Sequence, residues 1–178
     1  MLRLENLDEK TRKLMLEELE LDLQNNTLYI SPRLKESCKE KYIELFREAI
    51  KRGNDTTFAK SLRGAGCLKS HEHRRTRDGR LRFVKVPENA AEMLAEGEFN
   101  RFYIRALCRR VIEEGHGYLE VYRAKQVSTP RPESQRKIGQ KVDPYRLLED
   151  LRKHKEDTVL GIPGGPNSGL SVRIKYND

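Results

Sequence analysis

The sequence contains no tryptophan, and only 7% of its residues are aromatic. It also has no run of about 20 apolar residues, the length that a membrane-spanning helix needs. Hydrophobic residues make up only 36% of the chain, but they recur at regular spacings, which is not typical of a disordered protein. These scarcities exclude a helical membrane protein and predict one small core under a charged surface, with no membrane partner.

Cysteine is scarce as well, because Cys38, Cys67 and Cys108 are the only three and lie far apart. An odd number of distant cysteines does not match the disulfide framework of a small secreted protein, so we expect reduced thiols. The opening residues, MLRLENLDEKTRK, carry acidic groups where a signal peptide has an apolar run. We therefore expect a cytoplasmic protein, or one that lies within a virion or another particle assembled in the cytoplasm.

Positive charge, in contrast, is abundant. The chain has 36 Lys and Arg residues against 28 Asp and Glu residues, a formal net charge of +8. Cations that lie along a phosphate backbone release counterions, so this excess favours a nucleic-acid partner, DNA more than RNA. The alternative is that the charge serves solubility alone.

The length and the pattern of apolar residues predict a single α+β domain without internal repeats. We expect a central buried helix, with amphipathic helices packed on a small, mainly antiparallel sheet. Residues 1–18 are expected to form an N-terminal helical segment and residues 19–178 the domain itself. Extended loops are expected at residues 67–80 and 125–141.

Individual elements follow from periodicity, capping residues and turn residues. Helices are predicted over residues 8–18, 31–52, 55–64, 88–97, 98–115 and 144–155. Strands are predicted as a hairpin over 19–30, a basic hairpin over 67–86, a single strand over 118–124 and a pair over 158–176. The apolar arc of the helix over 98–115 is too wide for a surface helix, so this helix is expected to be the central one.

The predicted basic hairpin carries the strongest functional signal. Six cations surround its turn: Arg74, Arg75, Arg77, Arg80, Arg82 and Lys85. A two-stranded ribbon of this kind can follow phosphates or enter a groove, and guanidinium groups hold phosphate oxygens in pairs. The alternative is a solvated hairpin tip or a subunit contact.

A second group of cations lies on the helix over 98–115. Arg101, Arg105 and Arg109 are spaced at i, i+4 and i+8 and therefore form a stripe along one face. This stripe is a candidate for phosphate contacts. The alternative is that these arginines pair with nearby acids such as Glu98 and Glu113.

A third group of cations lies in the aperiodic stretch over 125–141, where a disordered basic arm can fold on nucleic acid. It consists of Lys125, Arg131, Arg136, Lys137 and Lys141.

Evidence for a metal site or a catalytic site is weak. Cys67, His71 and His73 are metal-ligand types, and Cys108 or His116 would complete a tetrahedral set, but paired zinc-type spacings are absent. No nucleophile–histidine arrangement and no phosphate-loop signature is present, so no catalytic residue and no cofactor are assigned.

A metal-dependent nuclease would need carboxylates and, often, a nearby lysine. Glu120 followed by Lys125 is the nearest approximation, although Arg123 takes the position at which such a lysine would project.

Three segments resemble the sequences of proteins from bacterial and phage or prophage genomes. They are EGEFNRFYIRALCRRVIEEG, EVYRAK and GPNSGLSVR. The chain resembles this phage-related group over most of residues 19–176. The group has no established activity, so the resemblance implies no site residue, but it implies a second class of function, in which basic loops face packaged nucleic acid or a neighbouring subunit.

We therefore expect a non-enzymatic, nucleic-acid-associated protein of a phage or mobile element. It would contact phosphates through the hairpin near residues 74–85 and the stripe of Arg101, Arg105 and Arg109. Two alternatives stay open: a virion structural or assembly protein that forms a homo-oligomer, and a metal-dependent nuclease.

Overall fold

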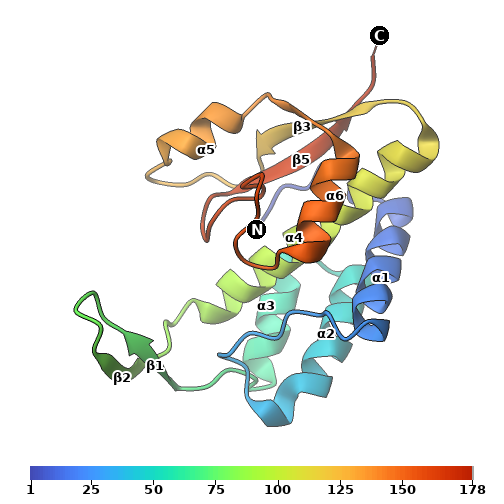
Figure 1. Cartoon of the computed structure of the whole chain (residues 1–178). Helices are drawn as coiled ribbons and strands as arrows, with labels where there is room; N and C mark the ends of the chain where they lie inside the picture. The colour runs from blue at the N-terminus through green and yellow to red at the C-terminus, as the bar shows by residue number, and fades with distance from the viewer. Residues whose placement is uncertain (178) are drawn as a thin grey trace.

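The longest helix, α4 (Ala90–Glu114), runs through the middle of the protein in the computed structural model, which describes residues 1–177 (Figure 1). Helices α1, α2 and α3 gather on one side of α4, whereas α6 and a three-stranded sheet pack against the other side (Figure 1). A separate two-stranded hairpin projects from this body (Figure 1). The other elements are α1 (Glu9–Gln24), the 3-10 helix η1 (Glu36–Cys38), α2 (Lys39–Arg52), α3 (Asp55–Gly64), β1 (His71–Arg75), β2 (Leu81–Lys85), β3 (Tyr118–Arg123), α5 (Pro132–Lys137), β4 (Lys141–Val142), α6 (Pro144–Lys153) and β5 (Leu170–Lys175). The predicted α+β class is confirmed.

Helix α4 is the buried central element that its wide apolar arc predicts. Phe99, Tyr103 and Leu107 are all fully buried. The sequence predicts a break at Gly97, but the helix is continuous there, because one glycine costs a helix only about 1 kcal/mol and α4 packs against α1, α3 and α6. Gly115, with a φ of 70°, ends the helix in the left-handed conformation. Neither α4 nor another helix within residues 1–177 has an apolar stretch long enough to cross a membrane.

The hairpin predicted over residues 19–30 is wrong, because α1 continues through Leu19 and Leu23 to Gln24. Leucines alternate with acidic residues here, which suggests a strand, but Leu, Glu and Gln are also good helix formers. The decisive contact is tertiary: Glu18 and Asp22, one helical turn apart, are both buried against α4.

The dipeptide Ser31-Pro32 does not begin a helix, although it is a typical helix start. The hydroxyl oxygen of Ser31 accepts the N–H of Arg33 at 3.2 Å, which closes a turn. The N–H of Lys35 then donates to the carbonyl of Cys67 at 2.9 Å, so this stretch runs beside the chain that follows α3. Pairing with a distant segment therefore overrides a local capping signal, and α2 starts later.

Aromatic rings join α2, α3 and α4 into the main core. Phe46 of α2 stacks on Phe58 of α3 with ring centres 4.7 Å apart, and it meets the edge of Phe102 of α4 at 5.3 Å. All three side chains are fully buried. These rings therefore form the contact through which α2 and α3 pack on α4.

The three-stranded sheet has the order β4-β3-β5 and is antiparallel throughout. Of the two strands predicted over residues 158–176, only β5 forms. The carboxylate of Asp150 accepts the N–H groups of Val159 and Leu160 at 2.9 and 2.8 Å. These amides are therefore bonded to a side chain of α6 and not to a neighbouring strand.

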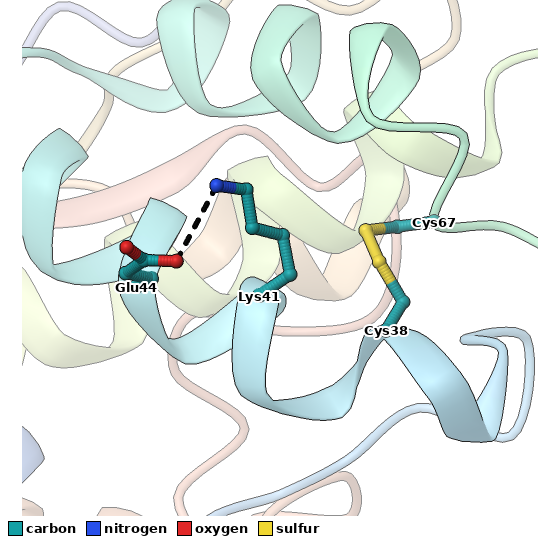
Figure 2. The surroundings of a disulfide bond; sticks show 4 residues. All are labelled: Cys38, Lys41, Glu44 and Cys67. Atoms are coloured by element: carbon teal, nitrogen blue, oxygen red, sulfur yellow. Dashed lines mark hydrogen bonds and ion pairs between the residues drawn. A yellow bond between two sulfur atoms is a disulfide. The ribbon is translucent and has the colours of Figure 1, made fainter.

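A disulfide links Cys38, at the start of α2, to Cys67, which follows α3 (Figure 2). The Cα atoms lie 5.3 Å apart, within the usual range for such a bond. The expectation of reduced thiols is therefore wrong for this pair, because residues far apart in sequence are neighbours in the fold. Cys108 is free and buried, as expected of a core thiol. The cysteines consequently give no support to a reducing compartment.

Candidate nucleic-acid interface

The predicted basic hairpin is confirmed and forms an arm, defined here as residues 71–85. Strands β1 and β2 are antiparallel, with His73 opposite Phe83 and Arg74 opposite Arg82. The turn closes through the N–H of Thr76, which donates to the carbonyl of Arg80 at 2.8 Å. The arm includes most of the loop predicted over residues 67–80, so that stretch is partly strand and not an extended loop.

The base of the arm is fixed to the body of the protein. Arg33 donates two hydrogen bonds to the carboxylate of Glu72, at 2.8 and 3.0 Å. Hydrogen bonds from Arg33 and Arg74 hold the pKa of Glu72 at about 2, so this carboxylate stays ionised at neutral pH. Just before the arm, the Cys38–Cys67 disulfide joins the chain to α2. An isolated two-stranded hairpin is only marginally stable, so these anchors give the arm a defined direction.

Side chains alternate between the two faces of the arm, as in any strand pair. We call the face that carries Phe83 the aromatic face. It consists of His71, His73, Arg75, Leu81, Phe83 and Lys85, and the opposite face carries Glu72, Arg74, Arg82 and Val84. Phe83 and Leu81 are 65% and 63% exposed, respectively, which is unusual for large apolar side chains.

The six predicted cations of the arm are all exposed. Arg74 pairs with Glu72 at 2.7 Å, and Arg80 pairs with Asp78 at 3.4 Å. Within residues 1–177, the other four form no ion pair with a carboxylate: Arg75, Arg77, Arg82 and Lys85. Four cations of the arm are thus available to a polyanion.

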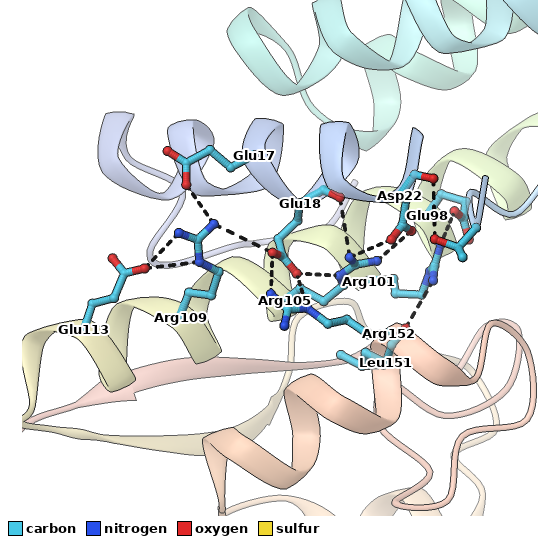
Figure 3. A network of polar contacts seen from close by, with 11 residues as sticks. Glu17, Glu18, Asp22, Glu98, Arg101, Arg105, Arg109, Glu113, Leu151 and Arg152 are labelled. Carbon is cyan, nitrogen blue, oxygen red and sulfur yellow. Dashed lines mark hydrogen bonds and ion pairs between the residues drawn. The ribbon is translucent and has the colours of Figure 1, made fainter. Parts of the chain in front are cut away.

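The predicted stripe of Arg101, Arg105 and Arg109 does not form a surface. Arg101 and Arg105 are 3% and 0% exposed, because α1 and α6 cover this face of α4. Figure 3 shows their guanidinium groups surrounded by acidic side chains. The prediction that these two arginines contact phosphates is therefore wrong.

Arg105 lies at the centre of a buried ion-pair network. Its two terminal nitrogens donate to both oxygens of Asp22 at 2.8 and 2.9 Å, and its Nε donates to Glu18 at 3.0 Å (Figure 3). Arg152 of α6 donates to Glu18 as well, at 2.9 and 2.7 Å. Burial alone would raise the pKa of Glu18, but the hydrogen bonds and charges of Arg152 and Arg105 outweigh it and lower that pKa. The network joins α1, α4 and α6.

The other two arginines of the stripe pair as the alternative interpretation proposed. Arg101 pairs with Glu98 at 2.8 Å, and Arg109, which is 22% exposed, pairs with Glu113 at 2.9 Å and with Glu17 at 2.8 Å (Figure 3). Each already has a carboxylate partner on this chain. The stripe is therefore structural, and only Arg109 reaches solvent.

The third group of cations is not a disordered arm, because residues 125–141 contain α5 and reach β4. Lys125 pairs with Glu96 at 2.6 Å, and Lys137 donates to the carbonyl of Leu160 at 2.7 Å. Lys141 lies over the ring of Tyr118 at 3.9 Å. These contacts use three of the five cations, and Arg131 and Arg136 are exposed.

The residues considered for a metal site or a nuclease have other partners. The sulfur of Cys67 is in the disulfide, and His71 stacks on Phe83. The carboxylate of Glu120 accepts two hydrogen bonds from Arg173, at 2.9 and 2.7 Å. No cluster of three or more His, Cys, Asp and Glu side chains suited to a metal ion occurs in the described part of the chain.

A groove of about 620 Å³ lies between the N-terminal half of α4 and residues 163–169. Acidic side chains outnumber basic ones along its walls. Its arginines are already paired: Arg33 with Glu72, and Arg101 with Glu98. The groove therefore does not extend the basic surface of the arm.

The exposed apolar side chains of the arm were missed by reasoning from the sequence, which placed Leu81 and Phe83 in a hairpin without predicting where they point. The available signal was that most of their neighbours are charged, so this hairpin has no apolar partner segment of its own. The chain matches no protein-family model, no curated protein and no solved structure.

Proposed function

We propose that the protein binds nucleic acid through the arm, without catalysing a reaction on it. The observation that carries this proposal is the set of four exposed cations, Arg75, Arg77, Arg82 and Lys85, on a hairpin that projects from the body. No carboxylate of residues 1–177 neutralises these four. Such a surface attracts a polyanion that is a separate molecule, and nucleic acid is one.

The arrangement also favours phosphate over solubility alone. Three of the four free cations are arginines, whose planar guanidinium groups bind phosphate oxygens in pairs. Elsewhere on the protein, many arginines are held by carboxylates, as Arg47 is by Glu20. The arm brings three arginines without a carboxylate partner together on one short hairpin, as a phosphate-binding surface requires.

The test is the salt dependence of binding to a fluorescent 20-nucleotide strand. Each phosphate contact contributes about 0.7 to 0.9 to the slope of log K against log salt concentration. The variant Arg75→Gln/Arg77→Gln/Arg82→Gln is therefore expected to flatten the slope by about 2 to 3.

The matched control removes three exposed charges from helices α2 and α3, as Lys39→Gln/Lys51→Gln/Lys60→Gln. It has the same net charge as the arm variant and should keep the wild-type slope. Equal slopes for the two variants would contradict the proposal, because binding would then follow net charge and not the arm.

A second candidate function is a structural or assembly protein of a phage-like particle, in which the arm contacts a neighbouring copy. The exposed Leu81 and Phe83 favour it, because large apolar groups on a surface often mark protein contacts. The Cys38–Cys67 disulfide is also more typical of particles and oxidising compartments than of the cytosol. Light scattering tests this candidate: a defined oligomer that dissociates in Leu81→Ser/Phe83→Ser supports it, and a monomeric wild-type protein opposes it.

A further inference from the structure

The aromatic face of the arm carries rings and cations in a regular order. At the rung nearest the body, His71 lies opposite Lys85. At the middle rung, His73 lies opposite Phe83, and at the rung nearest the tip, Arg75 lies opposite Leu81. Each end rung thus has one cation, and the middle rung has two rings.

Phe83 contacts both histidine rings of this face, and its ring is nearly parallel to that of His71 and tilted by 48° to that of His73. Phe83 stacks on His71 with ring centres 4.9 Å apart and planes 13° from parallel. Its centre lies 5.1 Å from that of His73. Phe83 remains 65% exposed although these rings flank it, and its ring faces no part of the core.

We propose that the aromatic face binds single-stranded nucleic acid in preference to duplex, with unpaired bases stacked on Phe83 and its histidine neighbours. This inference rests on the proposed function and names the substrate class of the same site. Aromatic side chains on a positively charged surface are the usual means of binding a single strand without reading its sequence.

The duplex fits this face less well, because its bases are stacked on one another and expose only their edges in the grooves. A phenylalanine ring gains little from those edges unless it separates two base pairs. In a single strand, by contrast, each base has a free face for a ring, and the phosphates on either side reach the cations of the end rungs.

The dimensions of the arm suit a short stretch of single-stranded nucleic acid. Its five-residue strands span roughly 17 Å at about 3.4 Å per residue. Lys85 and Arg75 mark the two ends of the aromatic face, with Phe83 between them. The other two free cations lie off this face, Arg82 on the opposite face and Arg77 in the turn.

The test uses anisotropy with three probes of equal length: a 20-nucleotide oligothymidine strand, the same strand in a duplex with oligoadenosine, and an abasic strand that keeps the phosphates. Wild-type protein should bind the oligothymidine most tightly. Phe83→Ala should weaken that binding by about 5- to 100-fold and leave the abasic and duplex affinities and the salt slope unchanged.

A second measurement uses the absence of tryptophan from the chain. Phe83→Trp places a single tryptophan on the exposed aromatic face, where folding does not depend on it. Oligothymidine should quench its fluorescence and bind with near wild-type affinity, whereas duplex and abasic strand should leave the fluorescence unchanged.

The outcomes separate this inference from the proposed function. If all three probes bind equally, and the triple arginine variant weakens binding but Phe83→Ala does not, the single-strand inference is wrong and the proposed function stands. If no probe shows salt-dependent binding, the proposed function itself is wrong. If Phe83→Ala changes only the oligomeric state, the face contacts a second copy of the chain, and the inference is overturned.

Discussion

Replacing Arg105 by methionine should destabilise the protein strongly, although no binding surface is touched. Arg105→Met removes the guanidinium but keeps a long, unbranched side chain in the same space. Asp22 then loses both of its bonds to Arg105, and Glu18 keeps its hydrogen bonds from Arg152 and a longer ion pair with Arg109 at 3.7 Å. Asp22 and Glu18 are themselves buried.

The magnitude follows from leaving buried carboxylates without their partner, which typically costs about 3–5 kcal/mol. A protein of this size is stable by only about 5–15 kcal/mol, so a large share of the free energy of unfolding should be lost. The midpoint of thermal unfolding should fall by about 6–20 °C.

Urea unfolding followed by circular dichroism measures this loss. Arg109→Gln is the matched control, because it removes the partly exposed arginine of the same helix face and should cost about 1 kcal/mol or less. The double variant Arg105→Met/Asp22→Leu should recover part of the lost stability, because it removes the buried carboxylate that Arg105→Met leaves without a partner. If Arg105→Met is as stable as Arg109→Gln, the network does not hold α1, α4 and α6 together. If the folded variant loses nucleic-acid affinity, Arg105 is not merely structural.

Three further predictions concern the same body of the protein. The pKa values of Glu18 and Asp22 lie below their ordinary values of 4.5 and 3.8, because the arginine hydrogen bonds and charges outweigh the effect of burial. Their contribution to stability is complete above those values and is lost as the pH falls through the folded-state pKa values. The free energy of unfolding should therefore decline as the pH falls below about 4.5, less steeply in Asp22→Asn, and an equal decline in both proteins would contradict the pairing. The disulfide closes a loop with a sequence separation of 29, so Cys67→Ser should lower the free energy of unfolding in urea by about 3–4 kcal/mol. Reductant should lower the stability of the wild-type protein but not that of the double variant Cys38→Ser/Cys67→Ser. The thiol of Cys108, whose pKa burial raises, should not react with iodoacetamide until the protein unfolds.

Periodicity predicted the elements whose partners lie close in sequence or whose pattern is unambiguous. The wide apolar arc of the helix over 98–115 identified the central helix, and the hairpin predicted over 67–86 turns at Asp78-Gly79, a dipeptide that favours tight turns. Gly115 correctly marked the end of α4. These features depend on local conformational preferences, which a sequence carries directly.

The errors arise where a distant segment decides the outcome. Leu19 to Leu23 alternate as a strand would, but Asp22 faces Arg105 only in a helix. Arg101 and Arg105 lie on the polar side of α4, and the sequence does not reveal that α1 and α6 cover that side. The same holds for Cys38 and Cys67, whose separation in sequence hides their contact. Among the predicted site residues, those of the arm alone form a coherent exposed group.

The most direct test of the central claim, that the arm is the surface that meets nucleic acid, is a nuclear magnetic resonance titration of isotope-labelled protein with oligothymidine. Chemical-shift changes should concentrate in residues 71–85 and include the ring signals of Phe83, while the amides around Arg105 stay unchanged. Changes centred on residues 131–141 or on α4, or no changes at all, would contradict the claim.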